Sequence, residues 1–187
     1  MANFCLFPTA LGPCGIAWRD GVVVATHLPE GSETATAARL ARRAGAVVGA
    51  PPLHIQLAIA AITALLEGEK IDLNDIACDF SRIDAFSTQV YAITRAILVG
   101  ETLTYGDIAV QLGDRRLAQR VGQALGRNPF PIIVPCHRVM GANAKLTGFS
   151  AGGGVATKLK MLAIEGAQIG EAPSLFGDLP LAIRPRG

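Results

Sequence analysis

The chain has 187 residues, of which 50% are apolar and 17% are charged. This balance excludes a disordered protein and is typical of a compact chain of one or two domains. No apolar run approaches the roughly 18 residues that a membrane-spanning helix needs, and the N-terminus lacks the basic flank and apolar core of a signal peptide. We therefore expect a cytoplasmic protein with no membrane partner.

The formal net charge of +2 hides an uneven distribution of charge along the chain. Residues 1–90 carry six Lys/Arg against nine Asp/Glu, whereas residues 91–160 carry nine Lys/Arg against three Asp/Glu. A basic segment favours an anionic partner, and nucleic acid is the first candidate. The alternative is chance clustering on a solvated surface.

The four cysteines are Cys5, Cys14, Cys78 and Cys136, and no two of them have CxxC spacing. In a reducing compartment this pattern argues against disulfides. Cys5, Cys14 and His27 form a loose group with metal-ligating chemistry, but small buried or surface thiols are the simpler interpretation. We expect no metal and no cofactor.

The first elements that the sequence predicts are a β-hairpin and a helix. Residues 14–27 form two short apolar runs around Asp20-Gly21, which is a strong signal for a two-residue hairpin turn. A helix should follow, with Ser32 as its N-cap and Gly45 as its end.

A second helix should begin after Pro51-Pro52 and end at Gly68. Residues 70–84 then alternate apolar and polar side chains, which predicts a strand followed by a loop. We therefore expect residues 1–83 to form an α/β domain with a small, mainly antiparallel sheet and helices.

After about residue 84 the apolar residues recur at helical spacing. Helices are predicted over residues 85–100, 104–113, 114–128 and 152–167. Thr104 suits an N-cap, and the two short helices that follow it fit a helix-turn-helix, although many bundles contain such a pair. We expect a mostly α-helical domain over 84–168 with a helix-turn-helix, and a C-terminal tail over 169–187.

The stretch NPFPIIVPCHRVMG, residues 128–141, combines an apolar run with a cysteine. Ile132 to Val134 are predicted to form a short buried strand or a packed extended segment. Pro135 ends any hydrogen-bonded ladder because it has no N–H group, and Cys136 follows directly. A thiol at this position suits a nucleophile, and it equally suits a small buried hydrophobic side chain.

A reactive cysteine needs a base or a positive charge nearby, because the thiolate is the reactive form. His137 is adjacent, but neighbours in an extended segment point to opposite faces, so a water would have to bridge it to the sulfur of Cys136. The imidazole would also need a carboxylate to orient it. The acidic residues in this part of the chain are Glu101, Asp107, Asp114 and Glu165. The alternative is a structural cysteine beside a solvent-facing His-Arg pair.

PCHRV at 135–139 resembles the active-site signature of the O6-alkylguanine-DNA alkyltransferases, also called methylated-DNA–protein-cysteine methyltransferases. The resemblance continues in family order through GETLTYGDIA at 100–109, RVGQALGRNPFPIIVPCHRV at 120–139, LTGFSAGG at 146–153 and KLKMLAIEG at 158–166. It implies a DNA repair protein that flips an O6-alkylguanine out of the duplex and transfers the alkyl group irreversibly to its own cysteine in a single turnover.

The resemblance also implies roles for residues around the thiol. Cys136 would be the acceptor, His137 would draw off its proton through a water, and Glu165 would orient the histidine. Tyr105 would contact the base and protonate the leaving guanine.

Further positions match the family's substrate contacts and hinge. The Val139 carbonyl would contact the guanine amino group, and Ser150 would lie beside the guanine oxygen. Phe149 would form an aromatic wall, where the family commonly has tyrosine. Asn128 would act as the hinge, and Arg138 would hold the loop.

The DNA-binding face would include Arg116, Gln119 and Arg120. Ala118 and Gly122 would belong to it as small residues that allow close approach to the minor groove, unless they serve ordinary helix packing. One departure concerns the position 17 residues before the cysteine, where the family usually has an arginine that fills the gap left by the flipped base. Gln119 stands there. Arg120 is one residue further along, about 100° around the helix, and cannot simply substitute for it. We expect weaker flipping or weaker duplex binding.

We expect a monomer whose partner is double-stranded DNA with alkylated guanine, and O4-alkylthymine is a further candidate substrate. The alternative is a non-enzymatic alkyltransferase-like lesion sensor that recruits other repair factors. A cysteine hydrolase is disfavoured, since hydrolases of that type need a distant histidine that touches the sulfur.

Overall fold

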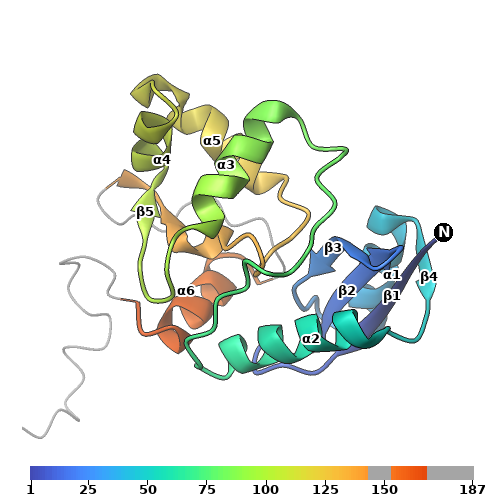
Figure 1. Ribbon diagram of the computed structural model, residues 1–187. Helices are drawn as coiled ribbons and strands as arrows, with labels where there is room; N and C mark the ends of the chain where they lie inside the picture. The colour runs from blue at the N-terminus through green and yellow to red at the C-terminus, as the bar shows by residue number, and fades with distance from the viewer. Residues whose placement is uncertain (143–152, 168–187) are drawn as a thin grey trace, which may run out of the picture.

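A four-stranded sheet with two helices forms the first half of the protein. The structure is a computed structural model that describes residues 1–142 and 153–167. The strands are β1 (Ala2–Phe7), β2 (Cys14–Arg19), β3 (Val22–His27) and β4 (Ala46–Val48), and the helices are α1 (Glu33–Ala44) and α2 (Leu53–Leu66). The strand order is β3-β2-β1-β4, with antiparallel pairs except for the parallel pair β1/β4. Figure 1 shows this half at one side of the molecule.

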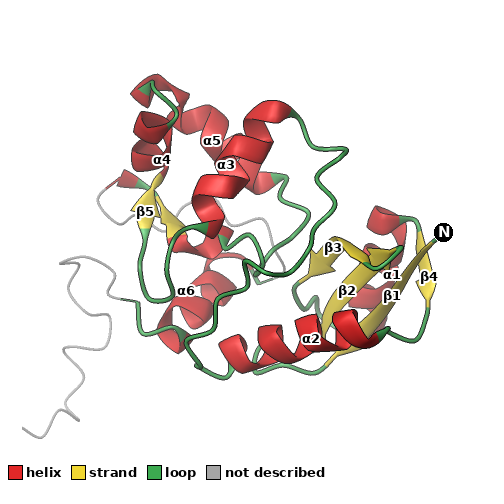
Figure 2. Ribbon diagram, viewed as in Figure 1, coloured by secondary structure: helices red, strands yellow, loops and turns green. Residues whose placement is uncertain are grey.

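The alternation of side chains along β2 explains why helices lie on both faces of the sheet. Ile16 and Trp18 point to the face where they pack with Ile55 and Ile62 of α2. Ala17 points to the opposite face, in the cluster that contains Leu40 of α1. Figure 2 shows the two helices flanking the sheet. The sheet is therefore buried on both faces, and the large apolar cluster lies on the α2 side.

The predicted hairpin and first helix are confirmed. Asp20 and Gly21 have φ angles of 48° and 83°, the positive values that a tight turn between β2 and β3 requires. The Ser32 hydroxyl accepts a hydrogen bond from the Ala35 N–H, and Gly45 ends α1 in the left-handed conformation with φ 59°.

The strand predicted within residues 70–84 is wrong. The structure gives one isolated bridge there, between Val23 and Cys78. The reason is tertiary: the Arg95 guanidinium donates to the carbonyls of Leu73, Asn74 and Ile76 at 3.2, 2.6 and 3.2 Å, which gathers them into turns around one side chain. An extended strand would spread those carbonyls apart.

The second half is mostly helical. Its helices are α3 (Ala85–Arg95), α4 (Tyr105–Gln111), α5 (Ala118–Gly126) and α6 (Gly154–Ile164), with 3₁₀ turns η1 (Arg115–Leu117) and η2 (Cys136–Arg138) and the short parallel strands β5 (Leu103–Thr104) and β6 (Val139–Met140). The helix predicted to reach residue 100 ends earlier, at Arg95, with Ala96 as its C-cap. Beyond it, the buried Ile97 turns its carbonyl to the Arg138 guanidinium, so this carbonyl accepts a side-chain donor instead of an intrahelical bond.

The start of α4 is set by a capping box, as the sequence indicated for Thr104. The Thr104 hydroxyl accepts from the Asp107 N–H at 3.0 Å, and the Asp107 carboxylate accepts from the Thr104 N–H at 2.8 Å. Gly113, with φ 96°, follows the end of α4. A 3₁₀ turn then leads directly into α5.

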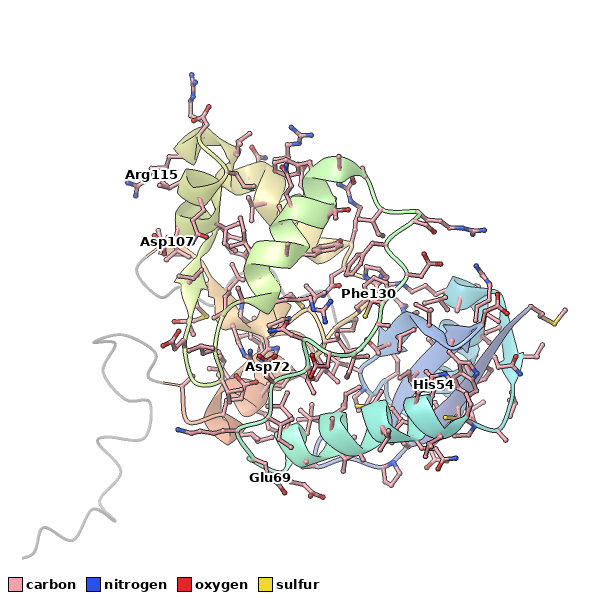
Figure 3. All side chains as sticks on the ribbon, viewed as in Figure 1. His54, Glu69, Asp72, Asp107, Arg115 and Phe130 are labelled. Atoms are coloured by element: carbon pink, nitrogen blue, oxygen red, sulfur yellow. The ribbon has the colours of Figure 1, made fainter. Side chains whose placement is uncertain are left out.

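The two halves share one hydrophobic cluster, which contains Ile16 and Ile62 from the first half and Val121 and Phe130 from the second. Figure 3 shows Phe130 at the junction between them. The predicted fold class, a small α/β part followed by a mostly helical part, is confirmed. None of the described helices is long and apolar enough to cross a bilayer. The tail predicted over 169–187 lies outside the described residues.

Candidate active site

The segment before Cys136 is a buried turn, so the predicted strand or extended run over 132–134 is wrong. Ile132 has a φ of 79°, which is a rare conformation for a β-branched residue. The Val134 N–H donates to the Phe130 carbonyl at 2.8 Å and closes the turn. From the sheet, Thr26 donates its hydroxyl to the Pro131 carbonyl at 2.7 Å. Packing and this bond hold a conformation that local preference opposes.

Asn128 ties the end of α5 to the same turn. Its side-chain amide donates to the Val134 carbonyl at 2.9 Å, and its side-chain oxygen accepts from the Phe130 N–H at 2.9 Å. The side chain is buried, so both bonds are shielded from water. Asn128 therefore fixes where the chain turns toward the cysteine.

Cys136 opens a 3₁₀ turn, and the expectation of an extended segment at this point is also wrong. The Arg138 N–H donates to the Pro135 carbonyl at 2.8 Å. Successive residues of a 3₁₀ turn are about 120° apart, so the Cys136 and His137 side chains still diverge. Cys136 is partly exposed, whereas His137 is fully buried.

Glu165, at the end of α6, joins the two residues that follow the cysteine. His137 Nε2 lies 2.9 Å from Glu165 Oε1. Arg138 donates through Nε to Glu165 Oε2 at 2.9 Å and through Nη2 to Oε1 at 2.8 Å, and through Nη1 to the Ile97 carbonyl at 2.6 Å. All three side chains are buried, so this hydrogen-bonded network is largely shielded from water.

The network fixes the tautomer of His137. Burial pulls the pKa of Glu165 upward, but the hydrogen bonds from His137 and Arg138 outweigh it and lower the pKa to about 2. An ionised carboxylate can only accept, so Nε2 carries the proton and Nδ1 keeps its lone pair. Burial lowers the pKa of His137, which keeps the ring neutral. Within the described part of the chain, the buried Nδ1 atom has no hydrogen-bond partner.

The Cys136 sulfur rests as a thiol. Burial raises its pKa, while the Asn128 side chain and the Lys158 charge act in the opposite direction. Lys158, on α6, is fully buried and donates from Nζ to the Val139 carbonyl at 2.5 Å. A neutral thiol near a neutral histidine needs a proton transfer before it can attack as a nucleophile.

Tyr105 is the first residue of α4 and is half-buried. A Cβ added to Gly122 on α5 would meet the Tyr105 ring at 3.8 Å, so the ring lies against the middle of α5. Burial raises the pKa of Tyr105, and a negative charge on Cys136 raises it further. The hydroxyl is therefore a proton donor at neutral pH.

The start of α5 presents an exposed basic face. Gln119 and Arg120 are exposed, and Ala118 and Gly122 are partly exposed. The Arg120 guanidinium stacks on the Phe86 ring at 3.8 Å from its centroid, which draws it toward α3.

Arg116 pairs with Asp114 at 3.0 Å beside this face, and its side chain is 91% exposed. Figure 3 shows the neighbouring Arg115 at the opposite end of the molecule from His54 on α2. The exposed arginines before α5 therefore lie far from the α2 side of the sheet.

Two predicted substrate contacts, Phe149 and Ser150, lie outside the described residues. Lys158 was not among the predicted site residues. Its signal in the sequence is its position seven residues before Glu165, which is two helical turns and therefore the same face of α6. Over residues 1–142 and 153–167, no group of three or more His, Cys, Asp or Glu side chains is arranged to hold a metal ion.

Comparisons with known proteins find relatives of this chain. A family model described as the DNA binding domain of 6-O-methylguanine DNA methyltransferase matches residues 85–167. A methylated-DNA–protein-cysteine methyltransferase of Mycobacterium bovis is 32% identical over 176 residues, which is 94% of this chain and 99% of the relative. One of Mycolicibacterium paratuberculosis is 44% identical over 108 residues, which is 58% of this chain and 63% of the relative.

Solved structures give the same result for the fold. The crystal structure of Mycobacterium tuberculosis O6-methylguanine methyltransferase has a TM-score of 0.73 and 32% identity, and the match covers 94% of this chain and 99% of that one. The structure of the M. tuberculosis protein in complex with DNA has a TM-score of 0.71 at 32% identity, over 88% of this chain and 92% of that one. The similarity therefore extends over both halves of the molecule.

Proposed function

Since the chain belongs to the methylated-DNA–protein-cysteine methyltransferase family, we propose that Cys136 is the sulfur that accepts the alkyl group. The protein is a DNA repair enzyme that transfers alkyl groups from DNA to a cysteine. The observation that carries the assignment to Cys136 is the buried network beside it, in which Glu165 holds His137 at 2.9 Å with Nδ1 as the free base.

The reaction follows from the protonation states. His137 Nδ1 takes the thiol proton of Cys136 through a bridging water, and Glu165 stabilises the imidazolium that forms. The thiolate attacks the alkyl carbon, a carbon–sulfur bond forms, and the carbon–oxygen bond to guanine O6 breaks. The guanine leaves as an anion and takes a proton from Tyr105. The thioether is stable, so each molecule acts once.

The substrate is double-stranded DNA that contains O6-alkylguanine, with the target base flipped out of the stack. We assign the contact to α4 and α5, acting as a helix-turn-helix. Ala118 has a small side chain and Gly122 has none, so both permit close approach to the minor groove. Arg116 and Arg120 supply positive charge for phosphates. We further propose that the protein acts as a monomer in the cytoplasm.

Gln119 distinguishes this chain from the usual family pattern. A glutamine can occupy the gap left by the flipped base and hydrogen-bond the orphaned cytosine, but it brings no charge. Arg120 does not take over this role, because its guanidinium stacks on Phe86 toward α3. Weaker flipping or weaker duplex binding is the expected result.

The deciding experiment is mass spectrometry of the intact protein after mixing with an oligonucleotide that carries O6-methylguanine. We expect a gain of one methyl group that maps to Cys136, is absent in Cys136→Ala and is retained in Cys78→Ala. Binding to the lesion without any mass gain would contradict the proposal, and would instead support a lesion sensor that recognises alkylated DNA without repairing it.

A further inference from the structure

Lys158 is the buried cation of this site that lacks a counter-charge. The residue is 0% exposed, and its ammonium group donates to the Val139 carbonyl at 2.5 Å. No described carboxylate forms an ion pair with Lys158, since the carboxylate of Glu165 is paired with His137 and Arg138. A carbonyl oxygen offers only a partial negative charge.

An arrangement of this kind is costly for the folded protein. Burying an ammonium group removes its hydration, and an isolated buried charge is normally either paired or neutralised. The position is explained if a full negative charge forms next to Lys158 in some state of the protein. Such a cation would be oriented in advance, and it would stabilise the charge when it develops.

The negative charge that fits is on the Cys136 sulfur. Val139 closes the 3₁₀ turn that begins at Cys136 by donating its N–H to the Cys136 carbonyl. An ammonium group anchored on the Val139 carbonyl is therefore fixed against the turn that carries the sulfur. Burial lowers the pKa of Lys158 and raises the pKa of the Cys136 thiol. The interaction between the two groups opposes both shifts, because each favours the charged form of the other.

We propose that Lys158 is the resident counter-ion of the Cys136 thiolate, a positioning residue whose buried charge stabilises the sulfur anion while it attacks. The proposal deepens the function above and rests on Cys136 being the acceptor. His137 removes the proton, and Lys158 supplies the lasting positive charge. The two roles are separate, because His137 acts as a base toward the thiol, whereas Lys158 acts on the sulfur anion through its charge alone.

Other groups contribute less to stabilising the anion. Besides Lys158 of α6, the charged or titratable side chains that interact electrostatically with Cys136 are Arg43 of α1, Tyr91 of α3 and Tyr105 of α4. Arg43 is exposed, so solvent and salt screen its charge. The two tyrosines are neutral donors at physiological pH, since burial raises the pKa of both. Lys158 is therefore the cation whose charge is least screened.

The test measures the pH dependence of Cys136 labelling by iodoacetamide without DNA, with the modified peptide mapped by mass spectrometry. Lys158→Met removes the charge at similar length, and Lys158→Arg keeps it. We expect Lys158→Met to move the labelling midpoint to higher pH, and each rise of one pH unit in that midpoint should slow the reaction at neutral pH about tenfold. Lys158→Arg should restore the profile. Lys160→Met, on the same helix, is the matched control and should leave the midpoint unchanged.

A labelling midpoint in folded Lys158→Met equal to that of the unmodified protein would overturn the proposal. If that variant does not fold, the natural chain offers a second test. NMR of protein with ¹³C-labelled lysine, before and after alkylation of Cys136 by iodoacetamide, should show the Lys158 titration moving to lower pH once the sulfur can no longer ionise. An unchanged titration would overturn the proposal. Because neither test uses DNA, failure of alkyl transfer from guanine would be seen separately.

Discussion

At the scale of single residues, Glu165 determines the chemistry beside the thiol. One carboxylate orients the His137 ring and neutralises the Arg138 guanidinium, and all three groups are shielded from water. The proton on His137 Nε2 is a consequence of that carboxylate being ionised. Loss of its charge would affect both the base and the fold.

Because of Glu165, the free energy of unfolding should depend on pH in the acidic range. Its pKa falls from an ordinary 4.5 to about 2 in the folded protein, so its contribution is complete above pH 4.5 and is lost as the pH falls toward 2. This contribution is about 3 kcal/mol by linkage. Urea unfolding across this range should show a smaller loss of stability in Glu165→Gln than in the natural chain. Parallel pH curves for the two proteins would contradict this.

Gln119 lies where the family usually has an arginine, so restoring the arginine tests its effect. Gln119→Arg should raise the rate of methyl transfer from duplex DNA, because a guanidinium fills the gap left by the flipped base and adds a positive charge. Single-turnover rates on duplex and on single-stranded oligonucleotides separate the two effects, since a single strand requires no flipping. Gln123→Arg, which adds the same charge one turn along α5, is the control. Equal duplex rates for Gln119→Arg and the natural chain would count against the idea.

At the scale of elements, α1 is tied to the end of α5. Arg43 donates to the Asn128 carbonyl at 2.8 Å and to the Arg127 carbonyl at 3.1 Å. These carbonyls follow the last turn of α5, where backbone acceptors are unpaired. A helix of the first half thus caps the helix that precedes the cysteine segment.

Arg43→Met should therefore weaken the site as well as the fold. We expect about 1 kcal/mol of lost stability, because the bonds are only partly shielded, together with slower alkyl transfer at a temperature where the variant is fully folded. Arg42→Met is the matched control, since its side chain has no hydrogen bond or ion pair within the described residues. Equal effects of the two substitutions on the transfer rate would contradict this role for Arg43.

Sequence and structure agree for those elements that depend on local backbone preferences. The hairpin at Asp20-Gly21 and the caps at Ser32 and Thr104 were predictable, because each depends on a backbone preference that acts within a few residues. The turn at Ile132 was not, since a β-branched residue with positive φ is held there by packing and by Thr26 from the sheet. The burial of Lys158 depends in the same way on distant parts of the chain.

The residues of the candidate site could be predicted from the sequence, whereas the backbone conformation of the turn that carries Cys136 could not. The residues His137 and Glu165 could be named from the signature and from the need for a carboxylate. The helix predicted to reach residue 100 and the strand within 70–84 failed, because Arg138 and Arg95 bind carbonyls that regular structure would have used. Side-chain to backbone bonds across long stretches of sequence leave no periodic signal.

At the scale of the whole molecule, the two halves differ in the sign of their net charge. The basic segment over residues 91–160 contains the exposed arginines around α5, and the first half carries net negative charge. Nucleic acid should therefore be attracted to the helical half. The buried network behind Cys136 lies in the same half as the basic face.

The shared hydrophobic cluster has a consequence for how the molecule melts. Ile16 and Ile62 of the first half pack in the same cluster as Val121 and Phe130 of the second, so neither half can unfold without exposing the other's apolar surface. Calorimetry should record one transition, with calorimetric and van't Hoff enthalpies in agreement. Two resolved peaks would show independent halves. A single transition would mean that the site around Cys136 is lost on heating only when the entire protein unfolds.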